Sequence, residues 1–110
     1  MMKVAQAQNL LELKPITVPC PDRDIEGVYT GDLLSWVMGR VSEGQAWVTI
    51  MSNLNIVAVA SLADVSCIIL AEGVELDQEV INTAQAKQIN ILSSEMSAYE
   101  ICVRLSEVLK

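Results

Sequence analysis

The sequence predicts a three-layer α/β/α domain with a mostly parallel sheet of about five strands, and three observations lead to this α/β fold class. Short apolar segments alternate with longer amphipathic ones through the second half of the chain, which is typical of successive βαβ units. Residues 65–71 are apolar almost without alternation, as a strand buried on both faces requires. The chain has 110 residues, 52% of them hydrophobic, so it can bury a core and fits a single domain over 1–110.

The N-terminal segments are expected to form the weaker elements. Residues 1–10 carry apolar side chains at helical spacing, and prolines restrict the extended segment 11–18 to a sheet edge at best. A turn follows at 21–24, where the Asp22–Arg23 pair is interpreted as structural, a turn stabilised by a carboxylate. Residues 25–29 form a second short extended segment.

A helix is expected to begin at residues 30–32 and to end at Gly39. Its apolar face comprises Leu33, Leu34, Val37 and Met38. The turn at Glu43–Gly44 then leads into residues 46–50, which predict a strand.

Residues 56–63 are ambiguous, because nearly every position is apolar and periodicity cannot separate a strand from a buried helix. Their β-branched residues favour a strand and their alanines favour a helix. If the flanking segments 46–50 and 65–71 are parallel strands, residues 56–63 must form the crossover helix between them.

The last third predicts a helix, a strand and a second helix. Asp77 is positioned to cap the first helix, and residues 89–92 form the short strand. Ser97 and Glu100 have the spacing of a capping box at the start of the last helix, and its apolar stripe reaches Leu109.

Charge and hydropathy exclude several classes of protein. The net charge is −7, and the seven Lys and Arg residues are scattered singly, so nucleic-acid binding is not expected. Trp36 and Trp47 are therefore expected to be core or interface anchors rather than base-stacking platforms. No apolar stretch reaches the roughly 18 residues of a membrane helix, and the N-terminus lacks the apolar core of a signal peptide, so we expect no membrane association and a cytoplasmic location.

No catalytic constellation is evident, and we expect no enzyme activity, no cofactor and no metal. The chain has no His, no CxxC pair, no P-loop, no GxGxxG and no GxSxG. Its three cysteines, Cys20, Cys67 and Cys102, are far apart, and the last two are interpreted as buried thiols acting as small hydrophobes.

Ligands of open parallel sheets gather beyond the carboxyl ends of the strands, which makes the loops after 46–50, 65–71 and 89–92 the candidate ligand site. The candidate ligand-binding residues are Ser52, Asn53, Asn55, Glu72, Gly73, Ser93 and Ser94. Helix capping and turn formation select the same residue types, so that simpler interpretation stays open. Glu72 and Glu95 are placed to form a carboxylate pair or to lie solvated at the surface.

The chain resembles the DRTGG domain family, which is related to the N-terminal domain of HPr kinase/phosphorylase and to a segment of some phosphotransacetylases. The resemblance covers nearly the whole chain. It involves PDRDIEG at 21–27, GDLL at 31–34, GQAWVTI at 44–50, NIVAVA at 55–60, IILAEG at 68–73, NILSS at 90–94 and SAYE at 97–100. It implies a compact α/β/α domain, a helix at 56–63, and a role in regulation or assembly beside other domains.

The resemblance does not imply activity, because the kinase chemistry of the HPr kinase relative lies in a separate P-loop domain that this sequence lacks. The chain also departs from the namesake pattern, in which Asp-Arg follows the third strand and Thr-Gly-Gly the fourth. Here those places hold Ser52–Asn53 and Ala71–Glu72–Gly73, so only Gly73 matches.

Two functions follow as expectations. The first is a non-catalytic regulatory or assembly module of the DRTGG type. It is expected to form a homodimer or another homo-oligomer, or to bind a protein partner, because so apolar a chain should leave an apolar face that a partner covers. The alternative is a sensor that binds a nucleotide or small anion at the strand ends, where helix N-termini offer free N–H groups.

Overall fold

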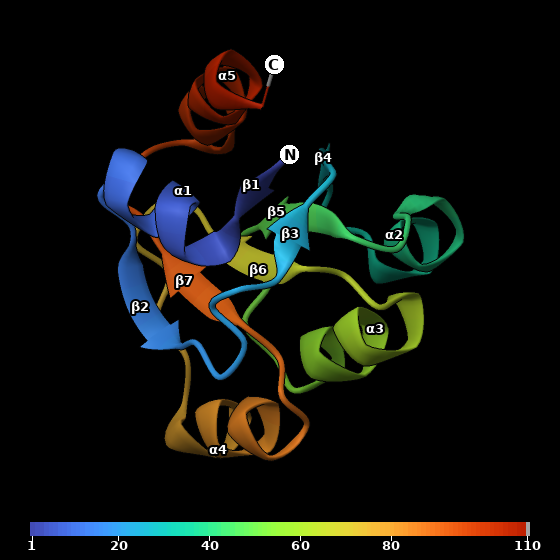
Figure 1. The fold of residues 1–110 in the computed structure, drawn as a ribbon. Helices are drawn as coiled ribbons and strands as arrows, with labels where there is room; N and C mark the ends of the chain where they lie inside the picture. The colour runs from blue at the N-terminus through green and yellow to red at the C-terminus, as the bar shows by residue number, and fades with distance from the viewer. Residues whose placement is uncertain (110) are drawn as a thin grey trace.

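The predicted parallel sheet is present in the computed structural model, which describes residues 1–109. Five strands lie in the order β2-β7-β6-β5-β4 (Figure 1). Their bounds are Lys14–Thr17 for β2, Gly27–Thr30 for β4, Gln45–Thr49 for β5, Cys67–Leu70 for β6 and Ile91–Ser93 for β7. Strands β4 to β7 are mutually parallel, and β2 alone runs antiparallel, against β7.

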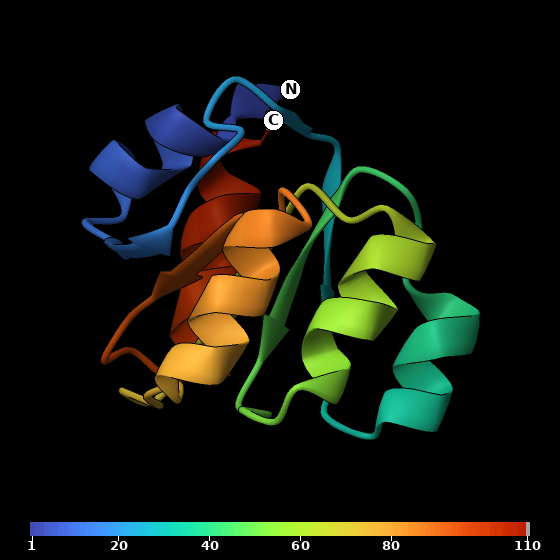
Figure 2. The same cartoon turned by 90° about the horizontal axis from the view of Figure 1, so that it is seen from below.

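Helices cover both faces of this sheet, which confirms the three-layer α/β/α fold class. Helices α1 and α5 lie on one face, and α2, α3 and α4 lie side by side on the other (Figures 1 and 2). Their bounds are Val4–Leu10, Leu34–Arg40, Asn55–Ala63, Gln78–Ala86 and Ala98–Val108, in order. A small antiparallel ribbon of β1 (Met2–Lys3) and β3 (Asp24–Ile25) lies apart from the main sheet.

The ambiguous segment is helical. Because β5 and β6 are parallel neighbours, with Trp47 opposite Ile68, the chain must return between them, and α3 makes that crossover. Four of its residues are buried: Ile56, Val57, Val59 and Ala60. Asp64 adopts a left-handed conformation (φ 58°) at its C-cap and ends the helix.

Strand β6 is the centre of the core. Cys67 and Ile69 point to the α1/α5 face, and Ile68 and Leu70 point to the α2–α4 face, all with no exposed surface. Because both of its faces are covered, the strand needs the unbroken apolar run that its sequence provides.

Helix α2 differs from its prediction. Gly39 lies inside the helix and does not end it, because Val41 N–H still bonds to Val37 O and the chain leaves the helix only at Val41. Val37 is the one buried residue of α2, whereas Leu33 and Met38 are exposed. The buried face of the helix is therefore narrower than the four-residue apolar face that the sequence predicts. Helix α2 lies at the margin of the sheet (Figure 1), where Val37 is the residue that it buries.

Two N-terminal predictions also need correction. The extended segment at 25–29 is divided between β3 and β4, which belong to different sheets. The turn at 21–24 is not closed by its own carboxylate, since Arg23 instead reaches Asp64 at the end of α3. Among residues 1–109, no helix has the length and apolar character needed to cross a membrane.

The capping box at α5 generates a stability prediction. Ser97 Oγ accepts the Glu100 N–H (3.2 Å), so Ser97→Ala should lower the free energy of unfolding by about 1 kcal/mol in urea denaturation. Ser106→Ala, in the same helix but away from its start, should change it by less than about 0.5 kcal/mol. Equal losses in the two variants would contradict the capping role.

Candidate functional site

The carboxyl ends of β5, β6 and β7 lie along one end of the sheet, as parallel pairing requires. Strand β2 runs the opposite way and begins at this end, where Lys14 pairs with Ser93 in register. The candidate site therefore gains a lysine from the N-terminal third of the chain.

A pocket of about 300 Å³ opens at this end of the sheet, between β2, the loop after β6 and the loop after β7. It is lined by Lys14, Ile16, Gly73, Val74, Glu75, Leu76, Ile81, Ser93 and Glu95. We call it the rim pocket. Ser93 is the buried polar residue of this set, and Lys14 is exposed at its margin.

Gly73 has a steric role in the rim pocket. Its φ of +70° favours glycine, and a Cβ there would lie 2.7 Å from each carboxylate oxygen of Glu95. Its N–H donates to Ser94 O (2.8 Å), and the neighbouring Glu72 N–H donates to Met96 O (2.9 Å). The loops after β6 and β7 are thus bound to each other through their backbones.

The structure brings together only part of the predicted site. Gly73 and Ser93 line the rim pocket, and Ser94 lies with Lys14 and Glu95 in an adjoining hollow of about 330 Å³. Glu72 is exposed beside it.

The residues from the loop after β5 lie elsewhere. Ser52 and Asn53 are exposed, and Asn53 Oδ1 accepts the Asn55 N–H (2.9 Å) at the start of α3. Asn55 lines a separate groove between α2 and α3. The predicted set is therefore divided between two places.

The electrostatics of the rim pocket disfavour a highly charged anion. Within the described residues, no carboxylate lies within ion-pair distance of Lys14, so its ammonium is available. The same lining, however, contains the carboxylates of Glu75 and Glu95, and Glu12 borders the adjoining hollow. One cation among three carboxylates suits a weakly charged polar ligand better than a polyphosphate.

Asp32 has a role that its sequence context does not reveal, since that context predicts only the start of a helix. Asp32 Oδ1 accepts from Thr49 Oγ1 (2.8 Å) and from Ile50 N–H (3.0 Å) at the end of β5. The bond fixes the loop between β4 and α2 to the sheet. The position of Asp32, two residues after β4, was the available signal of such a bond. Its partner Thr49 lies 17 residues further along the chain, and nothing in the sequence near Thr49 identifies it.

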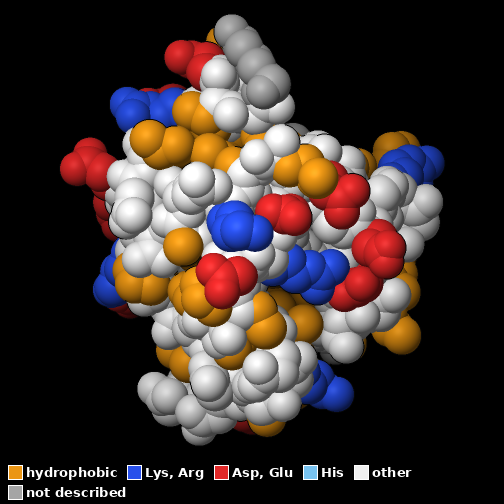
Figure 3. Space-filling view, in the orientation of Figure 1, with side chains coloured by type: hydrophobic (Ala, Val, Ile, Leu, Met, Phe, Trp, Pro, Cys, Tyr) orange, Lys and Arg blue, Asp and Glu red, His pale blue; other side chains and the backbone are white. Residues whose placement is uncertain are grey.

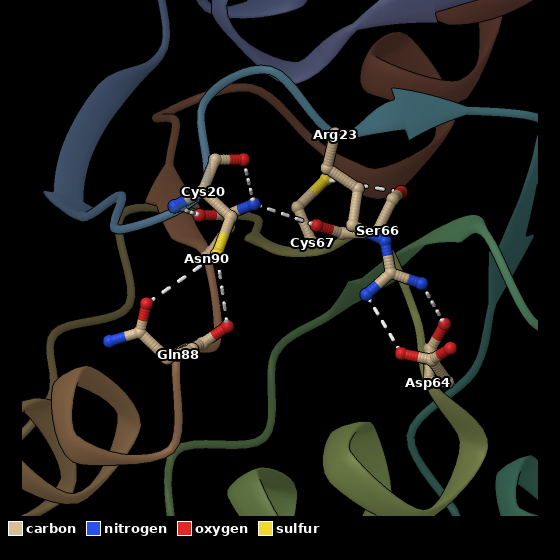
Figure 4. A network of polar contacts seen from close by, with 7 residues as sticks. All are labelled: Cys20, Arg23, Asp64, Ser66, Cys67, Gln88 and Asn90. Atoms are coloured by element: carbon tan, nitrogen blue, oxygen red, sulfur yellow. Dashed lines mark hydrogen bonds and ion pairs between the residues drawn. The ribbon is translucent and has the colours of Figure 1, made fainter.

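A polar network occupies the opposite end of the sheet, as Figure 4 shows. The buried Asn90 donates from Nδ2 to Cys20 O (2.8 Å) and Ser66 O (2.9 Å), and its Oδ1 accepts the Cys20 N–H (2.9 Å). Nearby, the Arg23 guanidinium donates to Asp64 Oδ1 (2.8 Å) and Asp64 O (2.6 Å). This network attaches the loop at 18–23 to the starts of β6 and β7.

Two of the three thiols, those of Cys67 and Cys102, have raised pKa values. Burial raises the pKa of Cys67 to about 12, although the Ser66 hydroxyl and Arg23 act in the other direction. Burial also raises the pKa of the half-buried Cys102. Both thiols stay protonated at neutral pH and are poor nucleophiles there. No group of three or more His, Cys, Asp or Glu residues within 1–109 is arranged to hold a metal ion.

Comparisons with known proteins give three findings, two of them from sequence. The family model of the DRTGG domain matches residues 28–108, which is more than half of the chain. No curated protein sequence matches.

A solved structure is also similar. It is a crystal structure of the CBS and DRTGG domains of the regulatory region of Clostridium perfringens pyrophosphatase, complexed with activator, diadenosine tetraphosphate. The TM-score is 0.68 at 14% sequence identity, over 97% of this chain and 45% of that one. This chain therefore spans less than half the length of that relative, and at this identity the likeness shows the fold.

The network around Asn90 generates a second stability prediction. Asn90→Ala removes the carboxamide that bonds the Cys20 N–H and Ser66 O, and it leaves Cys20 O with the Arg23 N–H alone. It should therefore lower the free energy of unfolding by about 3 kcal/mol in chemical denaturation. Asn82→Ala, at an exposed position of α4, is the matched control and should cost less than about 0.5 kcal/mol. Similar values for the two variants would show that the Asn90 carboxamide does not hold the loop.

Proposed function

The chain belongs to the DRTGG domain family, and we propose that it is a regulatory module without catalytic activity of its own. The family match over 28–108 carries this proposal, and the fold shared with a regulatory region supports it. The raised pKa values of Cys67 and Cys102 support the absence of catalytic activity, because a protonated thiol is a poor nucleophile.

The regulatory module extends beyond the matched residues, in this proposal, to the whole of 1–110. Val4 and Ala7 of α1 are buried in the same core cluster as Ile69 and Leu92 of the main sheet. Such shared burial is typical of one folding unit. The cytoplasmic location and the relation to HPr kinase stay predictions from the sequence.

The module acts by self-association. Large apolar side chains are exposed on or beside α2 and α3: Leu33, Trp36, Met38, Leu54 and Leu62. Neither helix contains Asp or Glu, although the chain carries a net charge of −7. Figure 3 shows hydrophobic side chains at the right-hand margin of one face, over α2 and α3, beside acidic and basic ones. Two copies of an acidic protein repel each other least where acidic side chains are absent.

Sedimentation equilibrium tests self-association. At micromolar concentration the protein should have a mass of at least two chains, and adding salt should not dissociate it, because the contact is apolar rather than ionic. A single-chain mass at every concentration would contradict self-association while leaving the family assignment intact.

A second candidate is binding of a nucleotide or small anion at the rim pocket. It is favoured by the unpaired Lys14 beside Ser93 in this chain and by the nucleotide activator named for the similar structure. The neighbouring carboxylates of Glu75 and Glu95 oppose a polyphosphate, so a singly phosphorylated ligand fits the rim pocket better than diadenosine tetraphosphate does.

A thermal-shift series with AMP, ATP and diadenosine tetraphosphate tests this candidate. A ligand at a hundredfold its Kd should stabilise the protein by about 2.7 kcal/mol. We expect the largest shift with AMP, its loss in Lys14→Glu, and its retention in Lys87→Glu, whose lysine is exposed at the end of α4. No shift with any of the three nucleotides would remove nucleotide binding from consideration.

A further inference from the structure

The outer edge of β4 offers backbone hydrogen-bonding groups with no partner. Gly31 N–H donates to Val48 O across the β4–β5 ladder, so by alternation the backbone groups of Tyr29 face β5 and those of Val28 and Thr30 face away. Outside the β4–β5 ladder, no hydrogen bond among residues 1–109 involves the N–H or C=O of Val28 or Thr30. Four strong polar groups therefore lie at an open margin of the sheet.

The two margins of the sheet differ in how they resist pairing. At the other margin, β2 contains Lys14 and Pro15, shows a register irregularity before Thr17, and is tied to α4 by the bond from the Thr17 hydroxyl to Gln85. Lysines, prolines and bulges are the devices that prevent a strand from accepting a neighbour. Strand β4 reads Gly-Val-Tyr-Thr and has none of them.

The acidic residues at the two ends of β4 do not face the open edge. Asp32 bonds to Thr49 and Ile50 of the neighbouring β5 segment. The Glu26 carboxylate lies against Gly44, where an added Cβ would come within 2.3 Å of it. Both carboxylates turn inward toward β5, so the edge remains free of negative charge in a strongly acidic protein.

An aromatic side chain lies beside this edge. Leu34 and Met38 of α2 line the groove toward α3, and Val37 faces the core. Trp36 therefore lies on the side of α2 away from α3, which is the side beyond β4, since both views place α2 outermost (Figures 1 and 2). Trp36 is 57% exposed, and the Arg40 guanidinium lies 4.1 Å from the centre of its ring. Tryptophan and arginine are the residues most enriched at the centres of protein interfaces.

We propose that β4 pairs antiparallel with β4 of a second copy of this chain, about a two-fold axis at Tyr29, with Trp36 of each copy packing across the junction. This assignment rests on the self-association proposed above, and of the exposed apolar side chains named there it uses Trp36, at the β4 side of α2. Val28 then lies opposite the partner's Thr30, and Thr30 opposite the partner's Val28, so the four free groups of each copy are all satisfied. A two-fold contact is self-complementary by construction, and this surface is free of the acidic side chains that would repel a second acidic chain.

Two substitutions test the surface by sedimentation equilibrium. Thr30→Pro removes a free N–H and the hydroxyl that donates to Val48 O (3.1 Å), but no backbone ladder bond of β4. Trp36→Ala removes the aromatic anchor. Each should raise the dimer Kd at least tenfold and leave the far-UV circular dichroism unchanged. Tyr99→Ala is the matched control, because Tyr99 is a 77% exposed aromatic residue on α5, and it should leave the Kd unchanged.

Hydrogen exchange of the wild-type protein gives a second measurement that needs no variant. The Val28 and Thr30 amides should exchange more slowly as protein concentration rises through the dimer Kd. A dimer that neither variant weakens, and whose two amides exchange at a rate independent of concentration, overturns the β4 assignment but leaves self-association standing. A wild-type protein that remains a monomer overturns both.

Discussion

Asn90 satisfies three backbone groups with one buried carboxamide, and the position of the N-terminal third depends on those bonds. They fix Cys20 and thereby the loop at 18–23. Carbonyls of that loop accept the first N–H groups of α1, from Val4 to Arg23 O (2.9 Å) and from Ala5 to Pro21 O (3.0 Å). At the start of α1 these loop carbonyls act beside Gln6 Oε1, which accepts the Lys3 N–H (2.8 Å). The loop that positions the helix is itself held by Asn90, 70 residues from Cys20.

The same third of the chain also shapes the candidate site. Because β2 enters the sheet against the direction of β7, its first residue rather than its last reaches the carboxyl ends of the parallel strands. That reversal places Lys14 beside Ser93 and gives the rim pocket its cation. The rest of the lining comes from loops that Gly73 allows to approach closely, and their carboxylates limit the negative charge that a ligand can carry.

Local chemistry determined how much could be predicted from the sequence. The unbroken apolar run of β6 and the Ser97–Glu100 box each leave a mark within a few residues, and each was predicted. Helix α3 leaves no such mark, and it was predicted only on the condition that its flanking strands are parallel and from the family resemblance. The contacts that were missed join distant segments: Arg23 with Asp64, Asp32 with Thr49, and Lys14 with the rim pocket. The extent of α2 was misjudged because a helix at a sheet margin buries little, and Gly39 can continue such a helix at small cost.

The proline and irregular register of β2 have a consequence for how large an assembly can grow. A sheet with two receptive margins can add chains at both, and the product is a filament of indefinite length. Here Pro15 supplies no N–H, and α4 lies against the strand through Gln85, so that margin cannot accept a further chain. Any edge-to-edge association of this molecule therefore stops at a closed pair, and polymerisation is prevented by the fold itself.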